Sequence, residues 1–521
     1  MLISLQQFRG IRPYIDPELL PNEEAQAAEN VRVRRGLIRP WDQILWKSDL
    51  VHQGLIKTIM LYESSHWFEW DADVDVVLAP LSGDTAGKLY FTGDGIPKKT
   101  NRDLATTGAG AKPISFYPLA LPSPKHAATA ALGAGGSGDA RDVNYVWTLV
   151  SNWSEESWPS PASNTVAAKQ GQTVDLSGMT HESQASTAYS LGECVIPTTP
   201  NGSLYKCVVA GTSAGTEPTW GTTIDGDTTD NTVTWRCFPD NMSYKRIYRL
   251  NVGTEFAQYQ FVDQIAASQK TYSDSKTDTE LAEALGTADY APPPDSLLGL
   301  IYMGNGIMAG FVGKDVYFSE PWQFHAWPVG YIISLPYNVI GLGVVPGALI
   351  AVTDGEPYIF SGVDPSAISH DPIPEAPACM SKRSIVSAVL DTPQGSRGQV
   401  LYACPFGVYI IDGAAGTLLT KDRLDKKSFA AYMPATMHGV VYDNYYFGFY
   451  SYGSDEGCLV VDLLTGDVTT LSLYADAAYV DRQTDQLYYV TGMNEVILLE
   501  NGSPSRINAL LQEDGSYILR E

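Results

Sequence analysis

The chain has 521 residues, 44% of them apolar, and 34 basic residues against 59 acidic ones give it a net charge of −25 at pH 7. This length exceeds what one compact core holds, so two to four domains are expected, and the apolar content excludes a globally disordered chain. The negative charge excludes stable binding of a phosphate backbone by the chain as a whole, but it suits a passage along which DNA slides without sticking.

Near the N-terminus, the stretch 20–41 reads LPNEEAQAAENVRVRRGLIRPW. Asn22, followed by two glutamates and three alanines, favours a short capped helix that runs to about Asn30. The alternation that follows, with a turn at Arg35 and Gly36, predicts a small hairpin. We assign residues 1–50 to this helix-hairpin unit. Its basic side chains either belong to a segment packed on its own domain or form a docking device for a partner, and they are Arg32, Arg34, Arg35 and Arg39.

Short strands built around an aromatic residue recur along the chain. They contain Tyr90, Tyr317, Tyr358, Tyr409, Tyr446 and Tyr488. From Tyr317 onward they stand about 40 to 50 residues apart, the length of one four-stranded propeller blade. The alternative is a set of unrelated strands in sandwiches, since tyrosine is common in any sheet. We predict an all-β fold with a β-propeller-like platform of about six blades, the first at 51–105 and the others at 291–521, in which these strands occupy equivalent positions.

A large insertion separates the first predicted blade from the rest. Residues 106–141 are rich in alanine, glycine and proline and predict a loop or linker. Short alternating strands in 142–179 and 241–290 predict an immunoglobulin-like or fibronectin-like sandwich. The stretch YVWTLVSNWSEESWPSP, starting at Tyr145, resembles strands of fibronectin-type domains in bacteriophage structural proteins.

A second module, 180–240, is nested inside that sandwich. Its SLYKCVV, EPTW and VTW stretches resemble a small carbohydrate-binding-like module of phage tail proteins. Trp220 and Trp235 either stack on a sugar face or form the module's core, and the core is favoured because so small a unit has little else to bury. Since the ends of the module fall between strands of one sandwich, we expect that it can be excised.

No catalytic signature emerges from the sequence. There is no phosphate-binding loop or nucleophile elbow, and the seven histidines lack metal-ligand spacing, so we predict no enzyme, no cofactor and no metal site. A glycosidase-type carboxylate pair stays open, because any two of 59 acidic residues could meet in the fold. The longest uncharged run, 328–353, is broken by prolines and glycines and predicts buried strands, not a membrane span.

Taken together, these stretches resemble one protein family. GIRPYIDPELLPNEEAQAAENVRVRRGLIRP (10–40), YFSEPWQFHAWP (317–328), VTDGEPYIFSGVDP (352–365) and ACMSKRSIV (378–386) are similar to the tail nozzle (tail tubular) proteins of short-tailed bacteriophages. The resemblance implies a virion structural protein, assembled in the host cytoplasm, that forms a homohexamer at the distal end of the tail tube.

The same resemblance implies a DNA ejection channel, through which the genome passes without stable binding, and docking of the arginine hairpin on an adaptor or connector ring. Tail fibres are a further candidate partner. Two alternatives remain open from the sequence: a tail-associated protein that binds host glycans, and a propeller enzyme that acts on polysaccharide.

Overall fold

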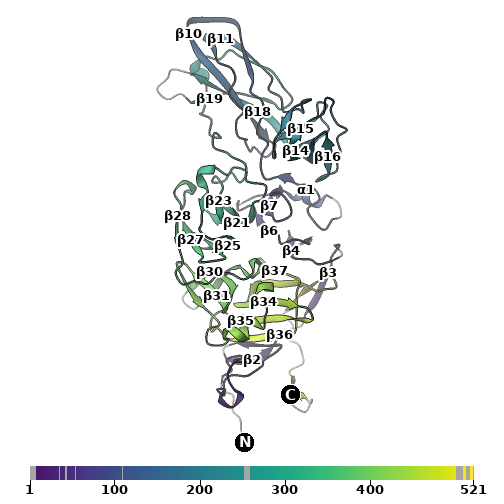
Figure 1. The fold of residues 1–521 in the computed structure, drawn as a ribbon, viewed down its shortest axis with the longest axis vertical. Helices are drawn as coiled ribbons and strands as arrows, with labels where there is room; N and C mark the ends of the chain where they lie inside the picture. Colours follow the sequence, from purple (N-terminus) through teal and green to yellow (C-terminus); the bar gives the residue numbers. More distant parts are fainter. Residues whose placement is uncertain are drawn as a thin grey trace.

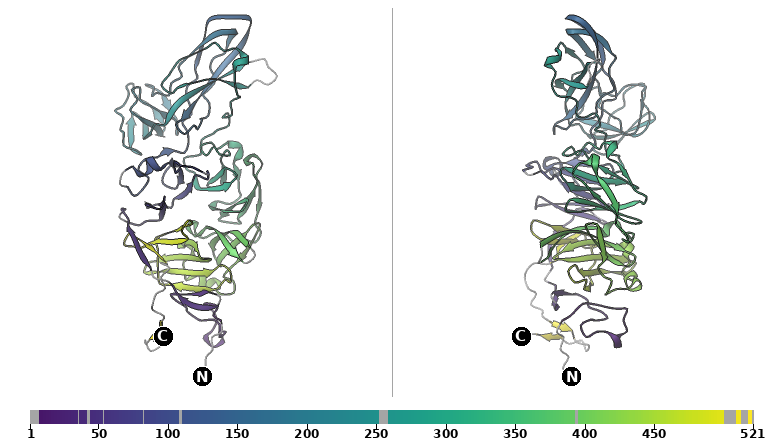
Figure 2. Two further views of the ribbon diagram at one scale, coloured as in Figure 1. Left: turned by 180° about the vertical axis from the view of Figure 1, so that it is seen from behind. Right: turned by 90° about the vertical axis from the view of Figure 1, so that its left-hand side faces the viewer.

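The computed structural model describes residues 7–34, 36–41, 44–52, 54–81, 83–107, 110–251, 258–392 and 395–499, together with the strands β40 (Ala509–Leu511) and β41 (Tyr517–Leu519). The chain is elongated, with a ring of sheets in the middle, a small hairpin at one end and an inserted group of strands at the other (Figures 1 and 2). In the described parts, α-helix is confined to two five-residue segments, α1 (Arg102–Thr106) and α2 (Lys426–Ala430). The predicted all-β class is therefore confirmed.

Six four-stranded antiparallel sheets follow one another around the ring and form a β-propeller (Figure 1). Blade 1 consists of β6 (Asp75–Leu78), β7 (Leu89–Thr92), β8 (Lys98–Thr100) and β9 (Tyr117–Pro118). Blade 2 consists of β21 (Leu298–Gly304), β22 (Ile307–Val312), β23 (Asp315–Phe318) and β24 (Ile333–Ser334). Blade 3 consists of β25 (Val339–Val345), β26 (Ala348–Thr353), β27 (Tyr358–Ser361) and β28 (Ser369–Pro372).

The other three blades complete the ring. Blade 4 consists of β29 (Val386–Thr392), β30 (Gly395–Cys404), β31 (Gly407–Asp412) and β32 (Ala415–Leu418). Blade 5 consists of β33 (His438–Tyr442), β34 (Tyr445–Tyr452), β35 (Asp455–Asp462) and β36 (Val468–Leu471). Blade 6 combines β37 (Ala477–Asp481), β38 (Gln486–Val490) and β39 (Glu495–Leu498) with β3 (Leu45–Asp49). The prediction of about six blades is confirmed.

Blade 6 joins the two halves of the chain. β3 pairs with β39, with Leu45 opposite Leu498, so a strand assigned from the sequence to the N-terminal unit is the outer strand of the last blade. Between blades 6 and 1 lies an extra hairpin, β4 (Thr58–Tyr62) and β5 (His66–Trp70), whose Phe68 packs in one apolar cluster with Phe91 of blade 1. The segment 51–105 therefore holds parts of two sheets, not one first blade.

The tyrosine strands do not occupy equivalent positions, so that stricter expectation is wrong. Tyr90, Tyr446 and Tyr488 lie in the second strand of their blades, whereas Tyr317, Tyr358 and Tyr409 lie in the third. Both are interior strands of a four-stranded sheet, and each pairs with a neighbour on both sides. Large aromatic side chains fit either position. Their spacing therefore predicts the length of a blade but not which strand of the blade each tyrosine belongs to.

The inserted domain is one five-stranded sheet in the order β19-β18-β10-β11-β20. Its strands are β10 (Thr129–Ser151), β11 (Val166–Ser177), β18 (Met242–Asn251), β19 (Tyr259–Ala266) and β20 (Tyr272–Asp274). β10 pairs with β11 along its first part and with β18 along its second, so one long strand links all five strands of the predicted sandwich. The predicted linker is wrong over 129–141, because these residues belong to β10 and pair with β11. Gly135, Gly136 and Gly138 adopt positive φ near the points where the register of this pairing shifts.

The nested module lies between the inserted domain and blade 1. Its strands are β12 (Ala188–Tyr189), β13 (Cys194–Val195), β14 (Ser203–Val209), β15 (Gly211–Thr212), β16 (Asp227–Asp230) and β17 (Val233–Pro239). Phe238 is fully buried edge-on against Phe116, and Lys98 of β8 forms an ion pair with Asp225 at 3.5 Å. Because excision would uncover Phe116, we expect a cost in stability, and the excision of the module stays a prediction.

Short 3-10 turns connect several strands. They are η1 (Pro17–Leu19), η2 (Asp278–Glu280), η3 (Val329–Tyr331), η4 (Pro365–Ala367), η5 (Lys382–Ser384) and η6 (Pro434–Thr436).

Candidate functional site

The N-terminal hairpin consists of β1 (Val31–Arg34) and β2 (Leu37–Pro40) and lies beside blade 5 (Figure 1). The hairpin prediction is confirmed, but the helix expected from Asn22 to Asn30 is wrong. That stretch consists of a turn, bends and isolated bridges, and Asn30 donates its backbone N–H to the carbonyl of Thr470 on β36 at 2.8 Å. Pairing with the outer strand of blade 5 satisfies backbone groups that a helix would have satisfied locally, so tertiary contact overrides helix propensity.

Strand β1 is fixed to the propeller. Val33 is buried, and its carbonyl accepts a hydrogen bond from the Tyr445 hydroxyl at 2.7 Å. Arg32 is only 8% exposed; it lies 3.7 Å from a carboxylate oxygen of Asp443 and 5.4 Å from the Trp41 ring centre. Docking on a partner through Arg32 would require this side chain to be exposed in the single chain. Arg32 instead packs on its own chain, so the docking assignment is wrong for this residue.

Strand β2 faces outward along its whole length. Arg39 is exposed directly opposite the buried Arg32 in the hairpin register, and Leu37 and Ile38 beside it are exposed apolar side chains. Arg34 is half exposed and reaches Asp443 at 3.5 Å. The fourth arginine of the predicted set, Arg35, lies outside the described residues.

The apolar residues of the hairpin are a signal that the prediction from its arginines did not use. Leu37 and Ile38 are adjacent in β2, so the strand does not alternate apolar and polar side chains there. A half-buried strand alternates apolar and polar side chains, whereas two adjacent apolar ones on a two-stranded hairpin leave at least one side uncovered.

A second polar cluster, also missed from the sequence, links segments that lead into the first strands of several sheets of the propeller. Lys382 contacts Asp73 at 2.8 Å and Asp75 at 2.9 Å. Arg383 donates to the backbone carbonyls of Lys57 at 2.7 Å and Asp476 at 2.6 Å. These residues lie in or just before the first strands of four different sheets, so Lys382 and Arg383 tie together sheets from all around the ring.

Electrostatics supports a structural role for this cluster. Burial opposes the charge of Lys382, but Asp75 and Asp73 outweigh it and raise the pKa of Lys382. Burial raises the pKa of Asp75 and lowers that of Arg383. The paired side chains of this cluster therefore hold several sheets of the propeller together. The signal for it was a Lys-Arg pair directly before an apolar strand in ACMSKRSIV.

A buried ionic joint connects the propeller to the inserted domain. Lys99 of β8 is fully buried and lies 2.6 Å from the carboxylate of Glu155. His325, from the loop after β23, is 3.9 Å from Glu155 and forms a 2.9 Å hydrogen bond with the carbonyl of Glu156. Burial lowers the pKa of His325 to about 4, so this histidine is neutral at pH 7. The joint holds blades 1 and 2 against the inserted domain.

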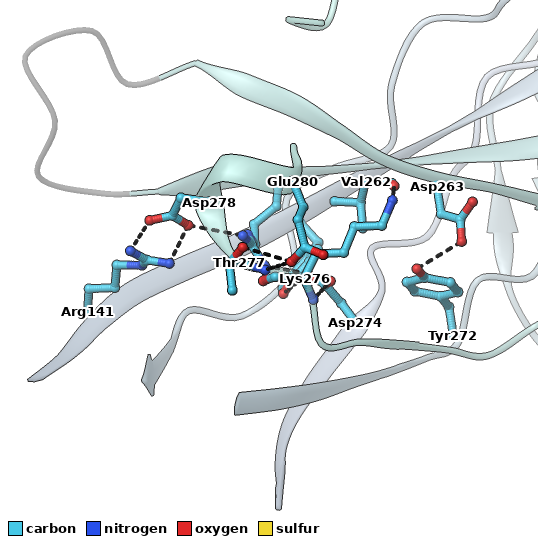
Figure 3. A network of polar contacts seen from close by, with 11 residues as sticks. Arg141, Val262, Asp263, Tyr272, Asp274, Lys276, Thr277, Asp278 and Glu280 are labelled. Atoms are coloured by element: carbon cyan, nitrogen blue, oxygen red, sulfur yellow. Dashed lines mark hydrogen bonds and ion pairs between the residues drawn. The ribbon is translucent and has the colours of Figure 1, made fainter. Parts of the chain in front are cut away.

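A further network lies inside the inserted domain (Figure 3). Asp274 accepts from Arg249 at 2.7 Å and from the Tyr145 hydroxyl at 2.9 Å, and Asp278 binds both Arg249 and Arg141. Asp274 is fully buried and Arg249 nearly so. The charged groups bind one another across β10, β18 and β20, which fixes the turn η2 on the sheet.

In the nested module, the two candidate tryptophans have different environments. Trp235 is completely buried in the module's core, so it cannot stack on a sugar and that candidacy is wrong. Trp220 is partly exposed, with its ring centre 4.2 Å from that of Tyr205. Its indole N–H donates to Glu217 at 2.9 Å.

Glu217 lines a small pocket of about 220 Å³. The lining also includes Ser183, Thr198, Ser213 and Asp230. Burial would raise the pKa of Glu217, but hydrogen bonds from Thr198 and Trp220 hold it below its usual value. The pocket thus has hydroxyl groups and two carboxyl groups, and Glu217 connects it to the partly exposed ring of Trp220.

Within the described residues, no three histidine, cysteine or acidic side chains gather closely enough to hold a metal ion. None of the helices in those residues is long and apolar enough to span a membrane.

Comparison with known proteins identifies no family. No protein-family model and no curated protein matches the chain. Solved structures that it resembles include TolB from Acinetobacter baumannii, at 14% identity and a TM-score of 0.23 over 50% of this chain and 61% of TolB. Another is the Pan2 WD40 domain from Neurospora crassa, at 10% identity and a TM-score of 0.25 over 61% of this chain and 98% of that one.

A gluconolactonase from Xanthomonas campestris is similar at 11% identity and a TM-score of 0.20, over 71% of this chain and 97% of that one. Scores this low carry no argument about activity, and no enzyme family is identified. The propeller assignment rests on the six blades of this chain itself.

Proposed function

We propose that this chain is a tail nozzle protein of a short-tailed bacteriophage, a structural subunit that assembles as a homohexameric ring at the distal end of the tail tube. The observation that carries the proposal is β2, which exposes Leu37, Ile38 and Arg39 although its partner strand β1 is fixed to blade 5. A firmly held strand with apolar and basic side chains in solvent has the composition of a docking element. The sequence resemblance along the chain agrees with this role.

The cluster around Lys382 and Arg383 supports one location for the DNA passage. Lys382 and Arg383 bridge the sheets at one end of the propeller, so a channel for DNA runs between subunits and not through a single propeller. A net charge of −25 gives such a channel a surface that repels phosphate and lets the genome move. DNA is then a passenger and not a bound ligand.

The proposal includes partners and a location. Arg39, and Arg34 through the half of its side chain that stays exposed beside Asp443, face an acidic surface on an adaptor or connector ring, where guanidinium groups bind carboxylates with defined geometry. Tail fibres attach elsewhere on the ring. The chain is made in the host cytoplasm, resides in the virion tail and carries no catalytic activity; turnover of a host polysaccharide by the purified chain, abolished by one carboxylate substitution, would contradict the last point.

A second candidate function has its own observation. The polar pocket lined by Glu217, which connects it to the partly exposed Trp220, favours weak binding of a host glycan by the nested module. A glycan array tests this, with Trp220→Ala expected to abolish any signal and Leu191→Ala, an exposed residue of the same module, expected to preserve it. An array without signal for the wild type would remove this candidate.

Native mass spectrometry of the purified chain tests the main proposal. A species of six copies is expected, and it should persist at high ionic strength where apolar contacts dominate the interface. A chain that stays monomeric at every concentration would contradict the ring.

A further inference from the structure

Two outer strands of the propeller lie on opposite sides of the molecule. β3 is the outermost strand of blade 6 and β28 is the outermost strand of blade 3. Both views across the ring place them at opposite edges, between the hairpin end and the inserted-domain end (Figures 1 and 2). Each therefore has one side without a strand partner in its own sheet, and such edges pair readily with another chain.

The β3 face is apolar and carries no net charge. Ile44, Leu45 and Trp46 are all exposed, Trp46 at 54%, and Val51 extends the apolar surface along the following segment. The stretch 44–52 contains one lysine and one aspartate. Soluble monomers rarely leave so many large apolar side chains together in water, so this face has the composition of an interface.

The β28 face is apolar and acidic. Val363 is 74% exposed just before η4, and η4 contacts η3, whose first residue, Val329, is also exposed. All four residues of β28 are exposed, including Asp371. The stretch 361–381 contains three acidic residues and neither lysine nor arginine. The two faces are thus both apolar, but only the β28 face has a net negative charge.

We propose that the β3 face of one copy binds the β28 face of the next copy, in a head-to-tail contact that builds the ring. This inference rests on the proposed function, because a ring needs such a lateral contact. A contact of β28 with itself would bring carboxylates together, whereas β3 against β28 brings Lys47 towards Asp364 and Asp371. A head-to-tail contact is the kind that closes into rings.

This contact also determines how neighbouring copies are oriented in the ring. Because both faces lie at the propeller's flanks, neighbouring copies stand side by side with their long axes roughly parallel. All hairpins then point to one end of the ring and all inserted domains to the other. One end is left free for an adaptor, and β2 remains outside the lateral contact.

Three variants test this contact by light scattering after gel filtration. Trp46→Glu disables the β3 face, Val363→Glu disables the β28 face, and Leu191→Glu, on the exposed surface of the nested module, is the matched control. Each face variant alone should associate at least about 10-fold more weakly than the wild type. Since all three side chains are exposed, the melting temperatures should equal that of the wild type.

The decisive sample is an equimolar mixture of Trp46→Glu and Val363→Glu. It retains one intact contact per pair, so dimers should form and growth should stop there. Normal assembly of either face variant would overturn the contact and leave the proposed ring intact. Loss of assembly in one face variant only would show a symmetric contact instead, and a wild type that never assembles would overturn the ring and this contact together.

Discussion

The two ends of the molecule, on either side of the propeller, use the same kinds of charged residues in opposite ways. At the inserted-domain end, Lys99 and Glu155 are paired inside the protein and join two parts of one chain. At the hairpin end, Arg39 stands in solvent beside exposed apolar residues, one register position from the buried Val33. Residue type alone thus does not distinguish a charge that holds the fold from one available to a partner; the surrounding strands decide it.

The largest effect is expected at the buried ionic cluster of Lys99, Glu155 and His325, which joins the propeller to the inserted domain. Lys99→Met leaves the carboxylate of Glu155 in a buried site without its cation, which should lower the free energy of unfolding by about 3–5 kcal/mol. Lys47→Met, on the exposed edge strand β3, should change it by less than about 0.5 kcal/mol. Denaturant unfolding of both variants measures the difference, and equal values would break the contrast between the two ends.

The two strands of the hairpin allow the sharpest matched pair. Val33 and Ile38 face each other in the register, but only Val33 is buried. Val33→Asp should release the hairpin or bury an unpaired charge, at a cost of about 3 kcal/mol. Ile38→Asp should leave stability within about 0.5 kcal/mol of the wild type. Limited proteolysis of the N-terminal segment gives a second readout, and equal protection in both variants would contradict the assignment of β1 as the docked strand.

Acidification should weaken the joint end selectively. Well above pH 6.5, His325 is neutral in both the folded and the unfolded chain. Between pH 6.5 and about pH 4, the histidine is protonated in the unfolded chain but stays neutral in the folded chain, because burial lowers its pKa to about 4. Stability should therefore fall as the pH drops through this window, by about 2 kcal/mol at pH 5.

His325→Gln keeps a donor for the Glu156 carbonyl and should lose this part of the acid sensitivity. Denaturant unfolding of both proteins at pH 7 and pH 5 separates the contribution of His325 to the loss of stability from the contributions of the other buried histidines. A stability difference between them that stays the same at both pH values would show that His325 does not contribute.

The smallest predicted effect compares the two arginines that face each other in the hairpin. Arg32→Met loses the Asp443 pair and the contact with Trp41, which should cost about 1–2 kcal/mol. Arg39→Met should cost nothing measurable in stability but should weaken attachment to an adaptor ring. Thermal unfolding separates the variants, and an equal loss of stability in both would mean that β2 is as important to the fold as β1.

Much of the architecture could be predicted from local signals. Aromatic strands at blade-length intervals gave the propeller, and the Arg35-Gly36 turn gave the hairpin. Failures arose where distant segments decide the structure. The alanine-rich stretch before Asn30 forms no helix because Ile11 pairs with it at Ala25 and β36 pairs with its end, and the glycine-rich stretch before Arg141 is a strand because β11 pairs with it.

The candidate site was predicted less well, for the same reason. Arg32 and Arg39 look identical in the sequence, and only the position of Asp443, about four hundred residues away, separates them. Lys382 likewise looks like any surface lysine until the fold brings Asp73 and Asp75 to it. Charge pairs between segments distant in sequence cannot be read without the topology.

Cryo-electron microscopy of the assembled protein tests the central claim most directly. The account predicts a six-fold ring in which β2 of every copy lies at the same end, Lys382 and Arg383 bridge the sheets of each propeller, and a passage wide enough for duplex DNA runs between the copies. A monomer, or a ring whose open passage runs through each propeller, would contradict it.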